Sequence, residues 1–152
     1  MKTHPFFEQI RKVEVEYRVA RVAVARYQFH VQANPRLLTE DAVVVADVLR
    51  CLERMERTFP VRMFSEFEAA LRDVWARVRK TQPEMQVLID RISDRWRVAP
   101  EVTGRVHEVR ELRNAVVHST TPPVEMALPE CRGHVCSFLS YVPYTFLLRP
   151  RK

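Results

Sequence analysis

The order of apolar and polar residues along the chain predicts a series of amphipathic helices. Between residues 6 and 31, apolar side chains recur at spacings of three and four, which indicates one face of a helix: Ile10, Val13, Tyr17, Ala20, Val24, Tyr27 and Val31. A second apolar stripe on the same helix is formed by Val15, Val19 and Val22. A helix that is apolar on two sides is either central in a bundle or covered by another subunit. The Asn34-Pro35 pair is expected to end it.

Two further helices are predicted on either side of Pro60. Thr39 is a plausible N-cap, with Glu40 and Asp41 in the first turn, where the helix dipole favours acidic side chains. One apolar face then follows, at Ala42, Val45, Leu49, Leu52, Met55 and Phe59. Pro60 is expected to break this helix. The next helix carries the most aromatic stripe of the chain, which is typical of a core: Phe64, Phe67, Leu71, Val74 or Trp75, and Val78.

The second half of the chain continues the helical pattern. Pro83 opens a shorter helix, with inward positions at Met85, Leu88, Ile89, Ile92 and Trp96. A fifth helix begins near Pro100 or Thr103 and runs to His118, with inward positions at Val102, Val106, Val109, Leu112 and Val116. The last runs from about Glu130 to Tyr141 and is stopped by Pro143, and the pattern assigns no element to residues 144–152. No strand-like alternation competes, so we predict one all-α domain over residues 1–152, an antiparallel bundle of five to six helices.

Composition supports this fold class and excludes several others. The chain of 152 residues is 47% apolar and 29% charged, as in soluble globular proteins. Two glycines against ten prolines leave little room for tight hairpins or phosphate-cradling loops. No apolar run approaches the roughly 18 residues of a membrane span, and no signal peptide is visible, so we expect a cytoplasmic protein and no membrane partner. The odd count of three cysteines indicates free thiols in a reducing compartment.

The charge of the chain favours an anionic partner. The formal net charge is +6, and four of the 25 basic residues are lysines, which leaves 21 arginines. Arginine binds phosphate with two parallel hydrogen bonds, so the balance favours nucleic acid. Codon bias in a GC-rich genome is the alternative explanation for the ratio of arginine to lysine.

The candidate chemistry lies in the stretch Val109–His118, at the end of the fifth predicted helix. At about 100° per residue, Arg113 falls inside the apolar stripe of this helix. A guanidinium directed at a core needs a carboxylate, carbonyl groups or a ligand anion, unless it lies where a second subunit meets the stripe. The alternative interpretation is an arginine whose charged end reaches solvent and a histidine that caps the helix.

Asn114 and His118 share one face, where the amide could hydrogen-bond the imidazole. Arg113 and His118 diverge by about 140° on a straight helix, so pairing two copies of the motif across a twofold axis would unite them most naturally. A histidine that exchanges protons near neutral pH is suited to acid–base work on a ribose hydroxyl. His107, Arg110 and Glu111 are predicted supporting residues.

The segment Arg113-Asn114-Ala115-Val116-Val117-His118 resembles the Arg-x4–6-His signature of the HEPN superfamily, in the form in which Asn follows Arg. The apolar approach to the motif, residues 109–112, is also similar, and about ten residues carry the specific match. The resemblance implies a HEPN-like helical bundle that forms a homodimer with its two motifs facing each other. It further implies a metal-independent endoribonuclease without cofactors, of a kind found among toxins and antiviral defence effectors.

Carried over to this chain, the resemblance gives roles to three residues. His118 would act on the 2′-hydroxyl or the leaving oxygen, Arg113 would stabilise charge on phosphorus, and Asn114 would orient and polarise the pair. The products would be a 2′,3′-cyclic phosphate and a 5′-hydroxyl. A toxin branch has a tyrosine two residues after the histidine, where a partner enzyme attaches a nucleotide; Thr120 stands there, so that regulation is doubtful. An antitoxin or regulatory protein remains an expected partner, and a non-catalytic module for RNA binding, protein binding or dimerisation is the alternative function.

A separate cluster, Cys131-Arg-Gly-His134-Val-Cys136, offers three soft ligands, to which His118 or Cys51 could add a fourth. Zinc sites usually contain paired Cys-x2–4-Cys units, and this spacing differs. We therefore expect no metal site and interpret the cysteines as buried thiols.

Overall fold

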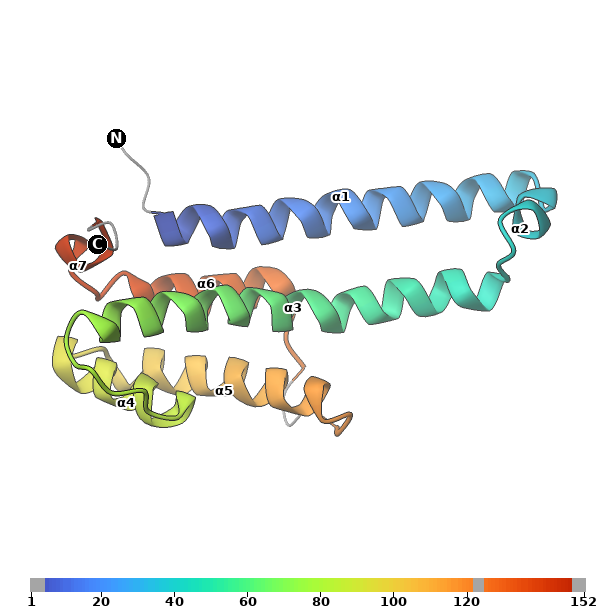
Figure 1. The fold of residues 1–152 in the computed structure, drawn as a ribbon. Helices are drawn as coiled ribbons and strands as arrows, with labels where there is room; N and C mark the ends of the chain where they lie inside the picture. The colour runs from blue at the N-terminus through green and yellow to red at the C-terminus, as the bar shows by residue number, and fades with distance from the viewer. Residues whose placement is uncertain (1–4, 122–124, 149–152) are drawn as a thin grey trace.

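The structure is a computed structural model that describes residues 5–121 and 125–148, and all regular structure in these ranges is helical (Figure 1). The helices in chain order are α1 (Pro5–Ala33), α2 (Arg36–Glu40), α3 (Val45–Ala76), α4 (Met85–Trp96), α5 (Pro100–Val117), α6 (Leu128–Leu139) and α7 (Tyr144–Leu148). The all-α prediction is confirmed, and the bounds of α1, α4, α5 and α6 lie close to those predicted. Helix α7, in the tail that the pattern left unassigned, follows Pro143.

Helices α1 and α3 run antiparallel along their whole length and form the most extensive helix pair (Figure 1). Around one half of this pair pack α4, α5, α6 and α7, and together they form the body of the molecule. The other half projects beyond the body, with α2 at its tip; we call this projection the arm, residues 18–58. The main core lies in the body. Its largest fully buried side chains include Phe64, Phe67, Phe138, Met63, Leu71 and Ile10.

Pro60 does not break the helix, and the two helices predicted on either side of it are one, α3. A proline inside a helix removes one backbone donor, here the one that would reach the carbonyl of Glu56. Contacts with α1 hold this turn in place: Tyr17 donates its hydroxyl to the Glu56 carboxylate at 2.6 Å, and its ring lies 5.3 Å from that of Phe59. The prediction was wrong because tertiary packing outweighs the loss of one hydrogen bond.

The predicted start of the second helix was also wrong. Thr39 lies inside the short helix α2, and α3 begins after Val44, whose backbone N–H donates to the Asp47 carboxylate at 3.0 Å. Val48 is the buried residue of this first turn. Val45 and Leu49, predicted to face inward, are 53% and 51% exposed, because Val48 takes the inward position of this turn. The later positions of the predicted face, Leu52, Met55 and Phe59, are partly buried.

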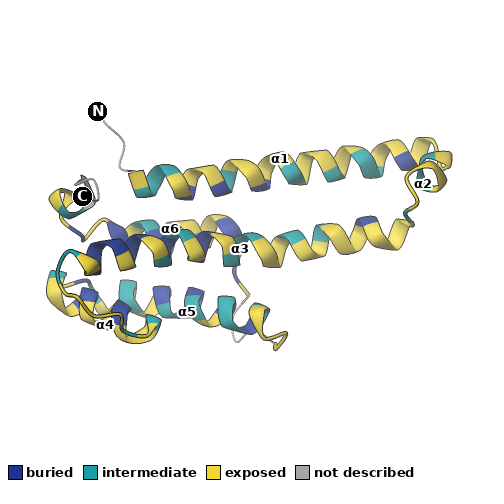
Figure 2. Cartoon of the chain, viewed as in Figure 1, coloured by how far each residue is buried: buried dark blue, intermediate teal, exposed yellow. Residues whose placement is uncertain are grey.

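Burial follows the body and leaves the outer side of α1 open (Figure 2). The second apolar stripe of α1 is exposed in this chain, so α1 is not central in the bundle. Within the described ranges, no helix combines the length and the apolar character needed to cross a membrane.

Candidate functional site

The candidate site lies on the C-terminal half of α5. The buried face of this helix packs against α3 and α6 and carries Val106, Val109, Leu112 and Ala115. Its N-terminal half lies beside α4, where Thr103 donates to the Ser93 hydroxyl at 2.9 Å and His107 Nε2 lies 2.8 Å from Asp90 Oδ1. Figure 1 shows that α4 does not extend along the C-terminal half of α5. The end of α5 beyond α4 is open to solvent at Val117 and His118, which are both exposed.

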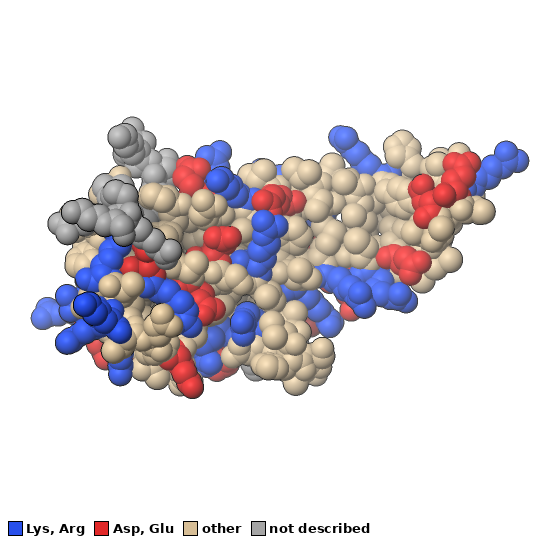
Figure 3. Space-filling view, in the orientation of Figure 1, with Lys and Arg blue, Asp and Glu red and all other residues tan. Residues whose placement is uncertain are grey.

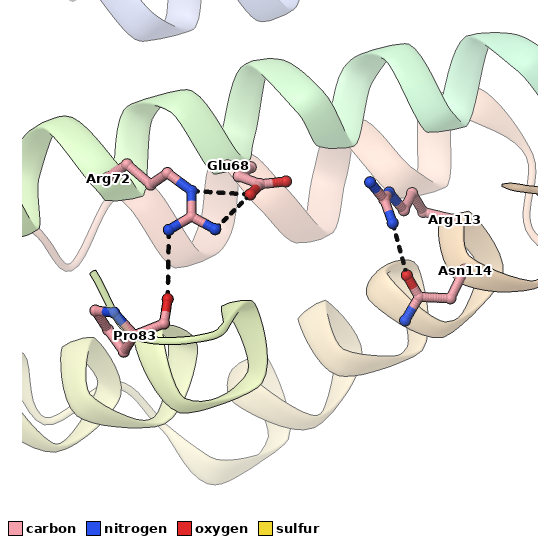
Figure 4. A network of polar contacts seen from close by, with 5 residues as sticks. All are labelled: Glu68, Arg72, Pro83, Arg113 and Asn114. Carbon is pink, nitrogen blue, oxygen red and sulfur yellow. Dashed lines mark hydrogen bonds and ion pairs between the residues drawn. The ribbon is translucent and has the colours of Figure 1, made fainter.

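Arg113 reaches from α5 toward α3 and is only partly exposed (Figure 4). Its Nη1 donates to Asn114 Oδ1 at 2.9 Å, whereas its Nε is buried without a hydrogen-bond partner. Among the residues that the structure describes, no carboxylate lies within ion-pair distance of Arg113. Glu68, which shares the view, is already bound by Arg72 through two hydrogen bonds of 2.9 and 2.7 Å. The guanidinium thus keeps its charge without an acidic partner in this part of the chain.

Arg110, one helical turn earlier, shares the unpartnered Nε but has an acidic partner. Its side chain is 17% exposed, its Nη2 lies 3.5 Å from the Glu111 carboxylate, and its Nε is buried without a hydrogen-bond partner. A buried donor that gives up water without gaining another acceptor costs free energy. Two such donors on neighbouring arginines make this surface suited to an anion.

His118 follows the last turn of α5 as its C-cap residue and is exposed. The helix end is closed by two backbone hydrogen bonds, from Thr120 N–H to the Ala115 carbonyl at 2.8 Å and from Ser119 N–H to the Val116 carbonyl at 3.3 Å. This closure places Ser119 in the left-handed region, with φ 55°. In the described structure, the His118 imidazole forms no hydrogen bond or ion pair.

The hydrogen bond considered between Asn114 and His118 is not formed, because the amide oxygen of Asn114 accepts from Arg113. A charged donor on the adjacent residue is the stronger partner for this oxygen. The structure therefore joins Arg113 and Asn114 within one chain and leaves His118 apart from both.

The remaining predicted site residues have other partners. The Asp90 contact of His107 fixes α4 to α5, and the second ring nitrogen of His107, Nδ1, is buried without a hydrogen-bond partner. Glu111 is the acidic neighbour of Arg110. Of the imidazoles of α5 and its C-cap, that of His118 is the one without a partner in the described structure.

A groove of about 580 Å³ lies beside the end of α5, and sequence reasoning did not predict it. Residues from α3, from α5 and from the segment after α5 line it: Glu53, Glu56, Arg57, Leu112, Val116, Ser119, Thr120, Thr121, Glu125, Met126 and Ala127. Neither Arg113 nor His118 belongs to this lining. In one chain, the motif residues therefore do not converge on a single groove.

The cysteine–histidine cluster of α6 serves the core. Cys131 is fully buried, and this burial raises the pKa of its thiol to about 12; burial also raises the pKa of Cys136. His134 lies 3.7 Å from the Glu130 carboxylate. Across residues 5–121 and 125–148, no three His, Cys, Asp or Glu side chains are grouped so that they could hold a metal ion.

No family model matches this chain, and neither the curated proteins nor the solved structures contain a match to it. The resemblance to the HEPN superfamily thus rests on the motif itself.

Proposed function

We propose that the chain is a metal-independent endoribonuclease of HEPN type that works as a homodimer, with Arg113, Asn114 and His118 of both copies at the active site. The observation that carries this proposal is the partly buried Arg113 guanidinium, which has no acidic partner among the described residues and a buried Nε without an acceptor. Such a group is suited to binding an anion that comes from outside the chain.

A phosphodiester fits the donors of this surface. A guanidinium offers five N–H donors in a planar fork that matches phosphate oxygens. Arg113 has one of these donors engaged by Asn114, which leaves others for a ligand. Arg110 adds a second positive charge one turn away. In the transition state, charge gathers on the phosphorus oxygens, so these donors would stabilise it more than the ground state.

The proposed reaction is a transesterification. The ribose 2′-oxygen loses its proton to a base and attacks phosphorus, while the bond from phosphorus to the 5′-oxygen breaks. The 5′-oxygen leaves with a proton from an acid, so the products are a 2′,3′-cyclic phosphate and a 5′-hydroxyl. The two proton transfers require one base and one acid.

The need for two proton-transfer groups favours a dimer. One chain supplies a single free imidazole at the motif, that of His118, because His107 is held by Asp90. On a straight helix, Arg113 and His118 point about 140° apart. A second copy docked on the open side of α5 would bring its His118 to the first copy's Arg113.

An enzyme that cuts cellular RNA needs restraint, so an antitoxin or regulatory protein is an expected partner, as in toxin–antitoxin and defence systems.

A non-catalytic RNA-binding module is the second candidate. One observation favours it: His118 is exposed, lies outside the groove beside α5 and contacts neither Arg113 nor Asn114 in one chain. In that case the arginines would bind the RNA backbone without cleavage, and affinity would fall steeply with salt.

The first prediction concerns RNA cleavage in excess EDTA. We expect wild-type protein to cut a mixed RNA substrate, leaving cyclic phosphate ends, and His118→Ala or Arg113→Ala to reduce kcat/KM by about 100-fold or more. His30→Ala is the matched control, because His30 is exposed near the far end of α1. It should cut like wild type.

Three outcomes separate the candidates. Binding of RNA without cleavage by any variant, with weaker binding by Arg113→Ala, would support the binding module and contradict the nuclease. Equal cleavage by wild type and His118→Ala would point to a contaminating nuclease. If wild type cut RNA without EDTA and failed to cut it with EDTA, the metal-independent mechanism would be contradicted.

A further inference from the structure

The outer face of α1 carries large apolar side chains that nothing in the described structure covers. Val15, Val19, Val22 and Phe29 are 44%, 63%, 45% and 69% exposed. In the space-filling view, uncharged side chains make up much of the visible surface of the arm (Figure 3). Val15, Val19 and Val22 adjoin one another at helical spacing, and apolar side chains gathered on one face in this way mark a site of protein–protein contact more often than an ordinary solvent face.

These residues form a seam with the spacing of a coiled coil. From Lys12 the positions follow at intervals of 3, 4, 3, 4 and 3 residues: Lys12, Val15, Val19, Val22, Arg26 and Phe29. At about 100° per residue, this outer seam lies opposite the face that packs on α3. The residues of that inner face include Ile10, Val13, Tyr17 and Val31, which are buried. Helix α1 is therefore patterned for two partners, of which the chain itself supplies one.

We propose that a second copy of this chain covers the outer seam, with the two α1 helices antiparallel about a twofold axis between Val19 and Val22. In this pairing Val19 packs on the partner's Val22, and Val22 packs on the partner's Val19. The seam is thus self-complementary, as a twofold interface requires. Knobs-into-holes packing between the helices follows from the alternating spacing of three and four residues.

The charged positions of the seam select the antiparallel direction. In a parallel pair every seam residue meets its own copy, so Lys12 would lie against Lys12 and Arg26 against Arg26, which is unfavourable. In the antiparallel pair the stem of Arg26 lies on the partner's Val15. The ammonium of Lys12 meets the ring of the partner's Phe29, a favourable cation–π pair.

Two further features favour close approach of the helices. The exposed residues that flank the centre of the seam include Ala23 and Ala25, which leave room for a second helix. Neither Lys12 nor Arg26 forms an ion pair with any described residue, so both are free to contact a partner. The antiparallel arrangement therefore covers the apolar centre of the seam and also gives the cationic groups toward its ends favourable contacts.

This interface is independent of the proposed nuclease dimer. Helices α1 and α5 lie on opposite sides of α3 in both the overall view and the close view (Figures 1 and 4). A chain that used both surfaces would assemble beyond a dimer, into a closed tetramer or an open filament. Loss of the α1 contact should therefore lower the assembly state and leave RNA cleavage intact, so failure of the α1 interface and failure of the nuclease are measured separately.

The test measures mass against concentration by sedimentation and light scattering. We expect wild type to self-associate and Val19→Asp/Val22→Asp to weaken that association by about 100-fold or more, since four carboxylates would meet at the axis. Val87→Asp is the matched control, because Val87 is a 39% exposed valine on α4, outside the seam. It should behave like wild type. A monomeric wild type, or an assembly state unchanged in the double variant, would overturn the proposal.

Cross-linking tests the direction of the helices and does not depend on the aspartate variants. The exposed Cys51 is first replaced by serine, and Lys12→Cys protein is then mixed with Phe29→Cys protein under mild oxidation by diamide. Antiparallel docking predicts disulfides between the two different variants. Disulfides confined to homodimers, Lys12→Cys with Lys12→Cys and Phe29→Cys with Phe29→Cys, would mean a parallel pair, and the absence of any cross-link would contradict the α1 interface. Circular dichroism spectra like that of wild type would show that each variant is folded.

Discussion

At the scale of single residues, Arg113 stands where an apolar side chain would suit the fold better. It lies on a helix whose neighbouring positions Val109 and Leu112 are buried, and its own Nε is shielded from water without an acceptor. Replacing buried charge with apolar groups of similar size is often neutral or stabilising. A residue that opposes stability in this way is typical of a binding or catalytic site, where function requires it.

We therefore predict that Arg113→Met stabilises the fold while it abolishes the proposed activity. The free energy of unfolding should rise by about 0.5–1 kcal/mol, because the unpaired donor is removed and the methionine chain fills the same space. Urea unfolding of the variant, run beside the RNA cleavage assay, measures both effects. A fall in stability of more than 1 kcal/mol would instead mean that Arg113 holds the helix pair together.

Arg72→Met is the control for this substitution. Arg72 donates two hydrogen bonds to Glu68 and a third, at 3.3 Å, to the carbonyl of Pro83 (Figure 4). Removing a satisfied surface pair should lower the free energy of unfolding by about 0.5 kcal/mol. The two substitutions are chemically identical, so opposite signs would isolate the effect of the missing partner.

The sequence predicted part of this site. Helical periodicity placed Arg113 in the apolar stripe, and the structure leaves it partly buried without an acidic partner among the described residues. Periodicity did not predict that Asn114 binds Arg113 instead of His118, because spacing fixes which residues share a face and leaves the choice of rotamer open. The groove formed by α3 and the segment after α5 depends on contacts between distant residues, which one-dimensional spacing cannot report.

At the scale of elements, the two glycines lie where alanine would be better. Gly104 and Gly133 are inside α5 and α6, and a Cβ added at either position would meet nothing within 4 Å. The left-handed positions of the described chain are instead occupied by Ala42, Arg97 and Ser119, with φ between 51° and 55°. Glycine destabilises a helix interior and suits a left-handed position. Stability is therefore lost both at the two glycines and at the three left-handed residues.

We predict that Gly104→Ala/Gly133→Ala raises the free energy of unfolding by about 1–2 kcal/mol, from the higher helix propensity of alanine. Thermal and urea unfolding measure the change, and RNA cleavage should be unaffected. Ala69→Gly, the reverse substitution at an exposed position inside α3, is the control and should lower stability by about 1 kcal/mol. Unchanged stability in the double variant would show that α5 and α6 owe little to helix propensity.

The prediction of helix ends was wrong at Pro60, where packing overrides the tendency of proline to end a helix. Proline is the strongest helix breaker in a sequence, and Pro60 was interpreted in that way. In the structure Pro60 is buried within α3, and the helix continues because Glu56 and Phe59 contact Tyr17 of α1. The tendency of Pro60 to break a helix is visible in the sequence. The contact that overrides it involves Tyr17, which lies more than forty positions earlier in the chain.

At the scale of the whole molecule, the body and the arm differ in how they are stabilised. The body contains the main apolar core. The buried residues that α1 contributes to this core are Ile10, Val13 and Tyr17, and no residue of α1 after Tyr17 belongs to it. The arm buries Val31 and Val48, and neither joins that core. Its other described contacts include the Tyr27 hydroxyl, which donates to Asp41 at 2.8 Å. Two helices with so little buried between them are expected to open more readily than the body.

Hydrogen exchange should make this difference visible and connect it to the proposed α1 interface. In Val19→Asp/Val22→Asp, where that interface is lost, we predict that amides of the arm exchange at least about 10-fold faster than those of α6, because local opening there costs less free energy. In concentrated wild-type protein, the amides of α1 from Val15 to Phe29 should slow, since a bound second helix must separate before they open. Dilution should reverse this protection. An arm that exchanges as slowly as the body in the double variant would mean that one chain stabilises its arm alone, and α1 would then need no partner for its order.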